Sequence, residues 1–408
     1  MQETTGLCQE ANKSVAALRR PVTVTVVAAA VLALHNAQRL APVSLFEELR
    51  LRLHTTYVGV GNLFGAYLLT YALFSIPAGL LADRRSAKRL MAGGAGLSLL
   101  ASGLFAVTQN YLVAMGARCL LGVGGAFLYV PTVRYVATSF SAEQRGLVMG
   151  CVQAGAGLGM ILPLALLPGL AQVSTPAQAF LFLPGISALV LVAVLFGVPP
   201  QHGSAGPARS GRAVLGASRS FWYYLAYFFL MMLAHYAASA WLPTYLRADL
   251  GYSAVDAGLT STLVSIAMVV GSPLAGFASD RFHTRLSVLL TGSLGSAIGF
   301  GIFVLSGEPT VIIGASLLCG VSIACTVPIF MMAVAESVGI GGAGLAVSVA
   351  ASVGQIASSL SGPLFGFVFQ LTGNFKLVWE TALIMAAASV PCLLLAWRAS
   401  VGHQKIRG

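Results

Sequence analysis

Apolar stretches that carry almost no charge recur along the whole chain, and they limit its possible folds more than any other feature. Only 9% of the 408 residues are charged, whereas a soluble domain carries roughly 25%. A helix that spans a bilayer needs about 20 apolar residues, and within lipid each backbone amide must be satisfied inside its own segment. The alternating pattern of a membrane barrel is missing from the sequence. The sequence therefore predicts an all-α membrane protein with twelve transmembrane helices.

A short motif that occurs twice indicates an internal duplication. Residues 79–84 read Gly-Leu-Leu-Ala-Asp-Arg, and residues 276–281, placed 197 positions later, read Gly-Phe-Ala-Ser-Asp-Arg. Pro131 recurs as Pro328 at the same spacing. We therefore expect two pseudo-symmetric six-helix bundles, joined by the Gly-, Ser- and Arg-rich stretch in the middle of the chain. The predicted divisions are an N-terminal tail at 1–21, a bundle at 22–198, a linker at 199–220, a bundle at 221–398 and a C-terminal tail at 399–408.

The net charge of +11 is explained by an uneven distribution of Lys and Arg along the chain. When the N-terminus is placed in the cytoplasm, most of the 23 Lys and Arg residues fall on cytoplasmic segments, as the positive-inside rule requires. This distribution predicts a multi-pass protein of the cell (inner) membrane with both termini in the cytoplasm and no nucleic-acid partner. The six cysteines lack the spacing of metal ligands, so we expect no metal and no cofactor.

The four tryptophans flank two of the predicted helices. Trp222 and Trp241 bracket the first helix of the second half, and Trp379 and Trp397 bracket its last helix. Tryptophan is enriched at membrane–water interfaces. We therefore expect these four rings to lie at the two membrane surfaces.

The two halves and their repeated motif resemble the major facilitator superfamily. Further matches to the patterns of that family are Arg118-x-x-x-Gly122 in the fourth predicted helix and Glu-Gln-Arg-Gly at 143–146, before the fifth. The resemblance spans the whole chain. It implies a transporter whose two halves surround a central site near the membrane midplane and work by rocker-switch alternating access.

The chain resembles one branch of that family, the anion:cation symporters, more closely. The string Trp-Leu-Pro-Thr-Tyr-Leu at 241–246 matches a signature of the branch. Two other signature positions differ, because Gln38 replaces the acid that precedes Arg39, and Gly125 replaces a glutamate in the fourth helix. The resemblance implies an anionic substrate, and the two replacements remove the usual proton acceptors of a symporter.

Ionisable side chains deep in the predicted helices are candidates for function, because each costs about 2.5–3.5 kcal/mol on membrane insertion. The deep cations are Arg39 and Arg118, and the titratable side chains with them are His35 and His235. No Asp or Glu falls in the middle of a predicted helix. A cavity with two arginines and no carboxylate favours a small organic anion, and a histidine is a candidate carrier of a coupling proton.

Each of these residues also has a structural interpretation. Arg118 would then tie the fourth helix to backbone carbonyls of the first or second helix, and Arg39 would extend its charge to the outer membrane surface. The histidines would be hydrogen-bonded packing residues. Without a buried acid, exchange of one anion for another and uniport stay open beside proton symport.

Aromatic and amide side chains complete the predicted substrate-binding set, because such groups orient bound solutes. The candidates are Tyr67, Tyr71, Tyr227 and Gln355. Tyr67 and Tyr71 are four residues apart and share one helix face. Packing in the helix interior is the alternative interpretation of each tyrosine.

The repeated motifs predict gating contacts rather than substrate contacts. Asp83 is expected to accept hydrogen bonds from the N-terminus of the eleventh helix or to pair with Arg134, and so to stabilise the outward-open state. The second motif is expected to act in the same way in the other half. The predicted gating set is Gly79, Asp83, Arg84, Arg134, Gly276, Asp280 and Arg281.

The function predicted from these features is secondary active or facilitative transport of a small organic anion by a monomer in the lipid bilayer, with a proton or an exchanged anion as coupling partner. Efflux of lipophilic compounds is one alternative, although no acid for a cationic drug is visible. A non-transporting sensor or scaffold with the same fold is another. An enzyme is not expected, because the sequence lacks a nucleophile–base set, a metal-ligand cluster and a phosphate-binding loop.

Overall fold

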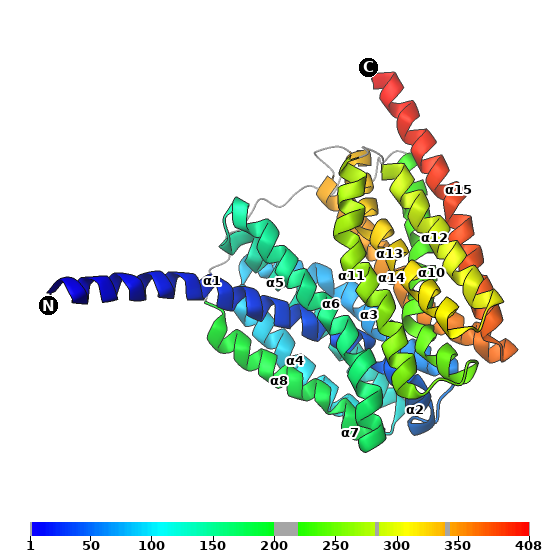
Figure 1. Ribbon diagram of the computed structural model, residues 1–408, viewed down its shortest axis with the longest axis horizontal. Coiled ribbons are helices and arrows are strands. Elements are labelled where there is room, and N and C mark those ends of the chain that lie inside the picture. Colours follow the sequence, from blue (N-terminus) through cyan, green and yellow to red (C-terminus); the bar gives the residue numbers. More distant parts are fainter. Residues whose placement is uncertain (1, 200–218, 282–284, 339–342, 408) are drawn as a thin grey trace.

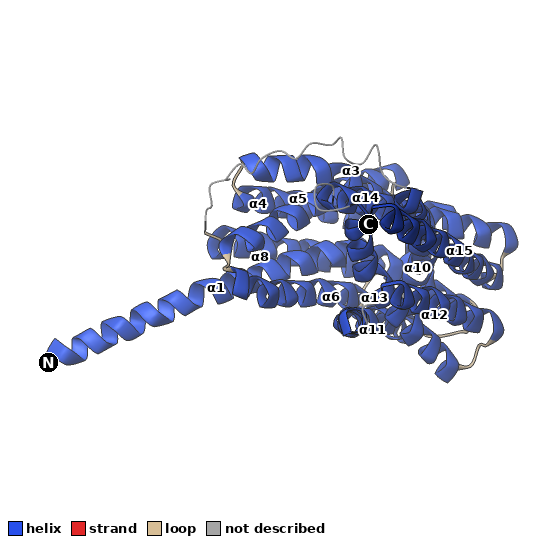
Figure 2. Ribbon diagram, turned by 90° about the horizontal axis from the view of Figure 1, so that it is seen from above, coloured by secondary structure: helices blue, strands red, loops and turns tan. Residues whose placement is uncertain are grey.

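The computed structural model describes residues 2–199, 219–281, 285–338 and 343–407, and every regular element in these ranges is a helix (Figure 2). The first half begins with the long helix α1, which continues beyond the bundle toward the N-terminus (Figure 1). Its elements are α1 (Gln2–Leu40), the 3-10 helix η1 (Ala41–Leu45), α2 (Phe46–Arg52), α3 (Tyr57–Arg84), α4 (Ala87–Val107), α5 (Tyr111–Ser139), α6 (Ala142–Val173), α7 (Pro176–Phe180) and α8 (Phe182–Gly197).

The second half repeats the pattern of the first. Its elements are α10 (Arg219–Ala248), α11 (Ala254–Arg281), α12 (Arg285–Leu305), α13 (Pro309–Val338), α14 (Ala343–Thr372) and α15 (Phe375–Arg407). The prolines inside α5 and α13, Pro131 and Pro328, occupy equivalent turns, as do Pro77 in α3 and Pro273 in α11. The predicted linker at 199–220 lies almost wholly outside the described residues, so its boundaries stay a prediction.

The helices are long and apolar enough to cross a membrane. Eleven candidate spans are found in the described residues, counting α7 and α8 as one span. The remaining long helix, α14, has 30 residues and is rich in serine. The hydroxyls of Ser352 and Ser358 donate to carbonyls one turn earlier in the same helix, which satisfies their polarity inside lipid. The predicted all-α membrane fold is confirmed.

Polar caps and two glycines set the helix ends on one side of the bundle. Thr56 and Asn110 accept hydrogen bonds from backbone amides in the first turns of α3 and α5, and Thr175 forms a capping box at the start of α7. Gly251 and Gly373 follow α10 and α14 with φ of 70° and 62°, a left-handed conformation that glycine adopts without strain. These residues produce the short turns that bring successive helices back through the membrane.

Two helix pairs join the bundles, α3 with α14 and α6 with α11. In the first pair, a Cβ on Gly61 would overlap the carbonyl oxygen of Gly362, and one on Gly65 would overlap that of Ser359. In the second pair, a Cβ on Gly258 would overlap the carbonyl oxygen of Leu164. Small residues thus let the backbones touch, which replaces the hydrophobic drive that is missing in lipid.

These contacts seal one side of the protein only. Gly61 and Gly65 belong to the first turns of α3, beside α2, whereas Leu69 and Ile76 continue the same face toward the other end and are 42% and 64% exposed. The helices of the two bundles accordingly converge near α2 and α7 and diverge toward the side on which the chain begins and ends (Figure 1). We call these the sealed side and the open side.

Two of the four tryptophans are covered by neighbouring parts of the protein. Trp241 and Trp379 are fully buried, and their indole nitrogens have no hydrogen-bond partner among the described residues. Trp241 packs edge-on against Phe46 of α2, with ring centroids 5.4 Å apart. Both lie near the sealed ends of α10 and α15, where α2 and neighbouring aromatic rings cover them. Their depth relative to the membrane surface stays a prediction.

Replacing Gly61 with alanine should shift the protein away from the sealed conformation, because the added methyl group has no room beside Gly362. Overpacking of this kind costs about 1–3 kcal/mol, which corresponds to a shift of about fivefold or more in the conformational equilibrium. The measurement is the alkylation rate of a cysteine placed at Ser239, between the bundles, in a background without other cysteines. An impermeant reagent added on the sealed side should react faster in Gly61→Ala.

The control for this prediction is Gly103→Ala, since nothing lies within 4 Å of a Cβ at Gly103. This variant should leave the alkylation rate unchanged. Equal alkylation rates in the Gly61 and Gly103 variants would show that the close backbone contacts between α3 and α14 do not hold the sealed side together.

Candidate functional site

A central cavity of about 750 Å³ lies between the two bundles. Gln153 near the start of α6 and Pro273 toward the end of α11 line it and are exposed, so the cavity opens to the open side. The first bundle contributes Asn36, Arg39 and Tyr129 among others, and the second contributes Tyr236 and several serine and methionine side chains. Both halves of the duplicated fold therefore build its wall.

Arg39 is the one Lys or Arg among the described residues that line this cavity, and no Asp or Glu is among them. Its guanidinium has no hydrogen bond or ion pair to any described residue, and its Nε is buried without a partner. Arg39 Cζ lies over the ring of Tyr236 in the other bundle, 5.4 Å from its centroid. An unpaired cation in a low-dielectric site attracts an anion strongly.

Three aromatic rings line the cavity beside Arg39, and one of them, that of His35, lies one helical turn before Arg39 in α1. The ring of His35 lies 4.9 Å from that of Tyr71 and 5.5 Å from that of Tyr129, and the two tyrosine rings are perpendicular at 6.2 Å. We call His35, Tyr71 and Tyr129 the aromatic cluster. Gly125 makes room for it, because a Cβ there would lie 2.8 Å from His35 Nδ1.

Arg118 lies behind this wall and does not line the cavity. It is fully buried and donates to the backbone carbonyls of Leu63 (2.9 Å), Gln38 (2.6 Å) and Arg39 (3.3 Å). The bonds run from α5 to the end of α1 and to α3, which is the structural interpretation considered for this residue. In this conformation Arg118 therefore positions Arg39 through the backbone.

Tyr67 connects His35 with Arg118. Its hydroxyl donates to the carbonyl of His35 at 2.9 Å and lies 2.9 Å from His35 Nδ1, while Arg118 Cζ lies 4.9 Å from its ring centroid. Tyr67 is fully buried and, like Arg118, is absent from the cavity wall. Its place is thus between the cavity residues and the buried arginine.

In the second bundle, two of the three candidates line the cavity. His235 Nε2 lies 2.8 Å from Ser296 Oγ, and its Nδ1 has no partner among the described residues. Gln355 also lines the cavity, with a buried Oε1 that lacks a described partner. Tyr227 is instead buried in the bundle and donates to the carbonyl of Leu289 at 3.4 Å. The cavity thus brings together five predicted residues: His35, Arg39, Tyr71, His235 and Gln355.

Tyr129 is a cavity residue that the predicted set lacks. It follows Arg118, Gly122 and Gly125 at spacings of four, three and four residues, so all four share one face of α5. That face would have identified Tyr129, because a helix face with a deep arginine and two glycines adjoins other helices. Asn36 is also on the wall, but its amide donates to Leu32 O in its own helix at 3.0 Å.

Comparison with known proteins supports the architecture. A model of the Major Facilitator Superfamily matches residues 25–362 and 245–405. The chain belongs to the major facilitator superfamily. It is 27% identical over 248 residues to an uncharacterized MFS-type transporter, YceJ, of Bacillus subtilis, a match that covers 59% of this chain and 63% of that protein, which is less than two thirds of YceJ.

Two further similarities extend over more of the chain. The 3-(3-hydroxy-phenyl)propionate transporter of Escherichia coli is 24% identical over 355 residues, which covers 83% of this chain and 82% of that protein. The crystal structure of a bacterial homolog to the human lysosomal transporter Spinster, in an inward-facing and occupied conformation, superposes with a TM-score of 0.76 over 95% of this chain and 97% of that one, at 14% identity. The facilitator fold is therefore shown by sequence and by structure.

The predicted gating residues of this facilitator lie at the open ends of their helices. Arg84 and Arg281 are the last residues of α3 and α11, and both are exposed. A Cβ added at Gly79 would lie 3.9 Å from the side chain of Val130 in α5. A Cβ added at Gly276 would have no described atom within 4 Å.

The acidic contacts expected of the two motifs stay predictions. The side chains of Asp83 and Asp280 lie outside the described residues. The expected pairing of Asp83 with Arg134 of α5 therefore stays a prediction.

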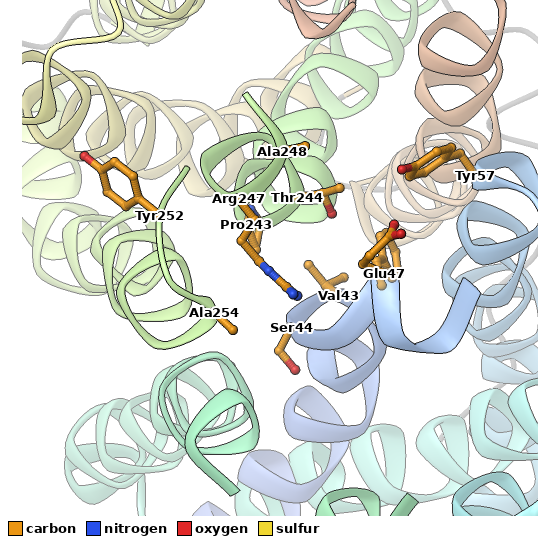
Figure 3. Close-up of a pocket in the computed structure, with 11 residues that line it drawn as sticks. Val43, Ser44, Glu47, Tyr57, Pro243, Thr244, Arg247, Ala248, Tyr252 and Ala254 are labelled. Atoms are coloured by element: carbon orange, nitrogen blue, oxygen red, sulfur yellow. The ribbon is translucent and has the colours of Figure 1, made fainter. Parts of the chain in front are cut away.

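The sealed side of the facilitator carries a smaller pocket of about 400 Å³ between η1, α2 and the end of α10 (Figure 3). Arg247 points from α10 toward Ser44 and Val43 in this view, and its guanidinium forms an ion pair with Glu48 at 2.8 Å. Glu47 pairs with Arg50 within α2. The Arg247–Glu48 pair joins the two halves across the closed end of the central cavity.

Arg118 and Arg39 should respond differently to loss of charge. Arg118→Met leaves three buried carbonyls without their donor, and hydrogen bonds from charged groups contribute about 1.5–3 kcal/mol each. We expect the free energy of unfolding to fall by at least about 3 kcal/mol, measured as a lower unfolding temperature of the purified protein. Arg39→Met removes no such bond and should leave this temperature nearly unchanged. Equal losses in both variants would contradict the assignment of Arg118 as a positioning residue.

Proposed function

We propose that this facilitator moves a small organic anion across the cell (inner) membrane by alternating access, with the anion bound at Arg39. The observation that carries the proposal is the unpaired guanidinium of Arg39 in a cavity wall whose described residues include no other full charge. Arg39 is half-buried and its Nε is buried without a described partner, and a carboxylate or similar group would satisfy it with charge-assisted hydrogen bonds. The same charge disfavours the lipophilic cations that the efflux alternative would carry.

The direction of the open side follows from the charge distribution. Most Lys and Arg residues lie on segments at the side of the two termini, which the positive-inside rule assigns to the cytoplasm. The conformation described above is then open to the cytoplasm and closed to the outside. Rocking of the two bundles would separate α3 from α14 and α6 from α11 on the sealed side and would break the Arg247–Glu48 pair. Arg39 would then be exposed to the other side of the membrane.

An organic anion is also the substrate class of the relative with the longest match reported above. That protein is a 3-(3-hydroxy-phenyl)propionate transporter, and 82% of its length is matched. The similarity is too low to transfer the substrate itself. It supports an organic acid as the kind of solute and transport as the kind of activity.

Exchange of anions is the coupling mode that the cavity favours. Closing the cavity around an unpaired Arg39 would bury an uncompensated charge, at an effective penalty of several kcal/mol. A bound anion removes that penalty, so the loaded carrier should reorient faster than the empty one. Proton coupling through His35 is the competing mode, since His35 lies within the aromatic cluster one turn from Arg39.

Arg39→Gln should weaken anion binding by about 10- to 150-fold, because one charge-assisted contact to a carboxylate is worth about 1.5–3 kcal/mol and the described lining residues include no second cation. The measurement is the shift in unfolding temperature of the purified protein against a panel of organic acids. Arg247→Gln, which removes the sealed-side cation, serves as the control and should keep the shifts. Undiminished shifts in Arg39→Gln would remove this residue from the binding site.

Uptake into proteoliposomes should accelerate at least about tenfold when the same anion is present on the inside, because the return step then carries a neutralised Arg39. The measurement compares labelled uptake into loaded and empty vesicles at equal pH on both sides. Uptake that ignores internal anion but follows an imposed pH gradient would overturn exchange and would favour proton coupling instead.

A further inference from the structure

The central cavity is layered along its axis, and the layers fit one class of organic anion. We propose that the substrate is a monocarboxylate with a hydroxyl-bearing aromatic ring: the carboxylate at Arg39, the ring beside the aromatic cluster and the hydroxyl at Gln355. This inference rests on the proposed function and names the substrate class of the same site. It follows from the charge of the cavity wall, the geometry of its rings and its unsatisfied polar atoms.

The charge of the wall fits one carboxylate and not two. Arg39 is the single Lys or Arg among the described lining residues. A second carboxylate would enter the cavity without a cationic partner, and an unpaired buried charge costs several kcal/mol. A dicarboxylate is thus disfavoured relative to a monocarboxylate of the same length.

The second bundle offers a further unsatisfied polar atom on a residue of the cavity lining, Nδ1 of His235. His235 precedes Tyr236, the residue over which Arg39 lies, and its Nδ1 is buried without a described partner. In the tautomer with the proton on Nδ1, Ser296 Oγ donates to Nε2 across 2.8 Å, and Nδ1–H is free to donate. His235 is thus a second donor on the lining that carries no charge of its own in this form, so it adds no cation to the wall.

The middle layer is aromatic on one wall and apolar on the other. His35, Tyr71 and Tyr129 lie toward the open side of Arg39, with ring centroids 4.9 to 6.2 Å apart. The second bundle contributes Phe228 and Met232 to the lining. A flat ring gains about 0.5–1.5 kcal/mol from aromatic partners beyond the area that it buries, and methionine sulfur adds favourable contacts with rings.

The far layer contains an amide that no described residue satisfies. Gly354 lies against Phe228, and Ser361 Oγ donates to Leu233 O at 3.1 Å, so α14 and α10 run side by side in the same direction. Gln355 is therefore level with Phe228, whereas Arg39 is level with Tyr236, about 12 Å further along the axis at 1.5 Å per residue. A ring that carries a hydroxyl and a short acid chain is of comparable length.

A hydroxyl group suits Gln355 better than other substituents. The buried Oε1 of Gln355 needs a hydrogen-bond donor, and leaving such a group unsatisfied costs about 1–3 kcal/mol. A hydroxyl donates one hydrogen bond and accepts others, so it fits either orientation of the amide. Packing alone does not explain a glutamine here, because a leucine would fill the same space without an unsatisfied oxygen.

The experiment measures dissociation constants of four acids with the purified full-length protein: 3-phenylpropionate, 3-(hydroxyphenyl)propionate, 3-cyclohexylpropionate and adipate. We expect the hydroxylated acid to bind about three- to tenfold more tightly than 3-phenylpropionate. The cyclohexyl acid should bind about three- to tenfold more weakly than 3-phenylpropionate. Adipate should bind at least about 100-fold more weakly than the hydroxylated acid.

Variants separate the hydroxyl from the rest of the ligand. Gln355→Leu should lower the affinity for the hydroxylated acid to that for 3-phenylpropionate, and Gln355→Met, which keeps the chain length, should do the same. Ser352→Ala is the matched control on α14, since its hydroxyl donates to Ser348 O and does not line the cavity. It should retain the preference for the hydroxylated acid. Unfolding temperatures without ligand identify any variant that fails to fold.

The outcomes distinguish this inference from the proposed function. If phenyl and cyclohexyl acids bind equally, or if both Gln355 variants keep the preference for the hydroxylated acid, the substrate class is wrong while organic-anion transport stands. If the four acids and other organic anions all fail to bind, the proposed function fails with it. A hydroxyl preference that disappears only in the Gln355 variants supports the inference.

Discussion

The bonds of Arg118 to three backbone carbonyls hold the first bundle in the shape on which the cavity depends. A guanidinium inside the membrane must be satisfied, and here the carbonyls of Leu63, Gln38 and Arg39 satisfy it. Two of these carbonyls belong to the last turn of α1, just before the chain turns into η1 and α2. The same bonds therefore fix the end of α1, place the Arg39 side chain and start the segment that covers the sealed side.

The duplicated fold uses its two halves unequally. The position that repeats Arg118 is Ser316 in α13, whose hydroxyl donates to Ile312 O in its own helix. The first bundle thus carries the cation and the aromatic cluster, whereas the second contributes His235, Gln355 and flexible methionine side chains. A charged wall opposite an adaptable wall suits a site that must bind one end of a solute firmly and still change shape.

Much of the fold was predictable from the sequence, because the bilayer leaves few choices to a chain of this composition. The repeat at 79–84 and 276–281 predicted two bundles, and two bundles are present. The burial of Trp241 could not be predicted in this way, since it depends on α2 folding back over the end of α10. Interfacial preference concerns the depth of a tryptophan in the membrane and does not tell whether its ring faces lipid or protein.

The candidate site was predictable in its residue types but not in its layers. A deep arginine signals function or structure equally, and only the carbonyl contacts separate Arg118 from Arg39. Helix periodicity places Tyr67 and Tyr71 on one face, yet Tyr71 lines the cavity while Tyr67 lies behind it. The difference comes from Gly125, whose missing side chain lets Tyr67 reach His35, and such a cross-helix vacancy is invisible in one sequence.

The sealed side is built to open again. Its helix seams depend on van der Waals contact between glycine backbones, and among the described side chains Arg247–Glu48 is the ion pair that joins the bundles. Both partners of that pair are partly exposed, and exposed pairs contribute about 0.2–1 kcal/mol. A transporter needs its two conformations within a few kcal/mol of each other, so that a ligand's differential affinity can shift the balance. Weak closure outside the cavity and an unpaired Arg39 inside it meet that requirement together if the anion binds at Arg39 as proposed, because the bound anion would then supply the larger part of the energy difference.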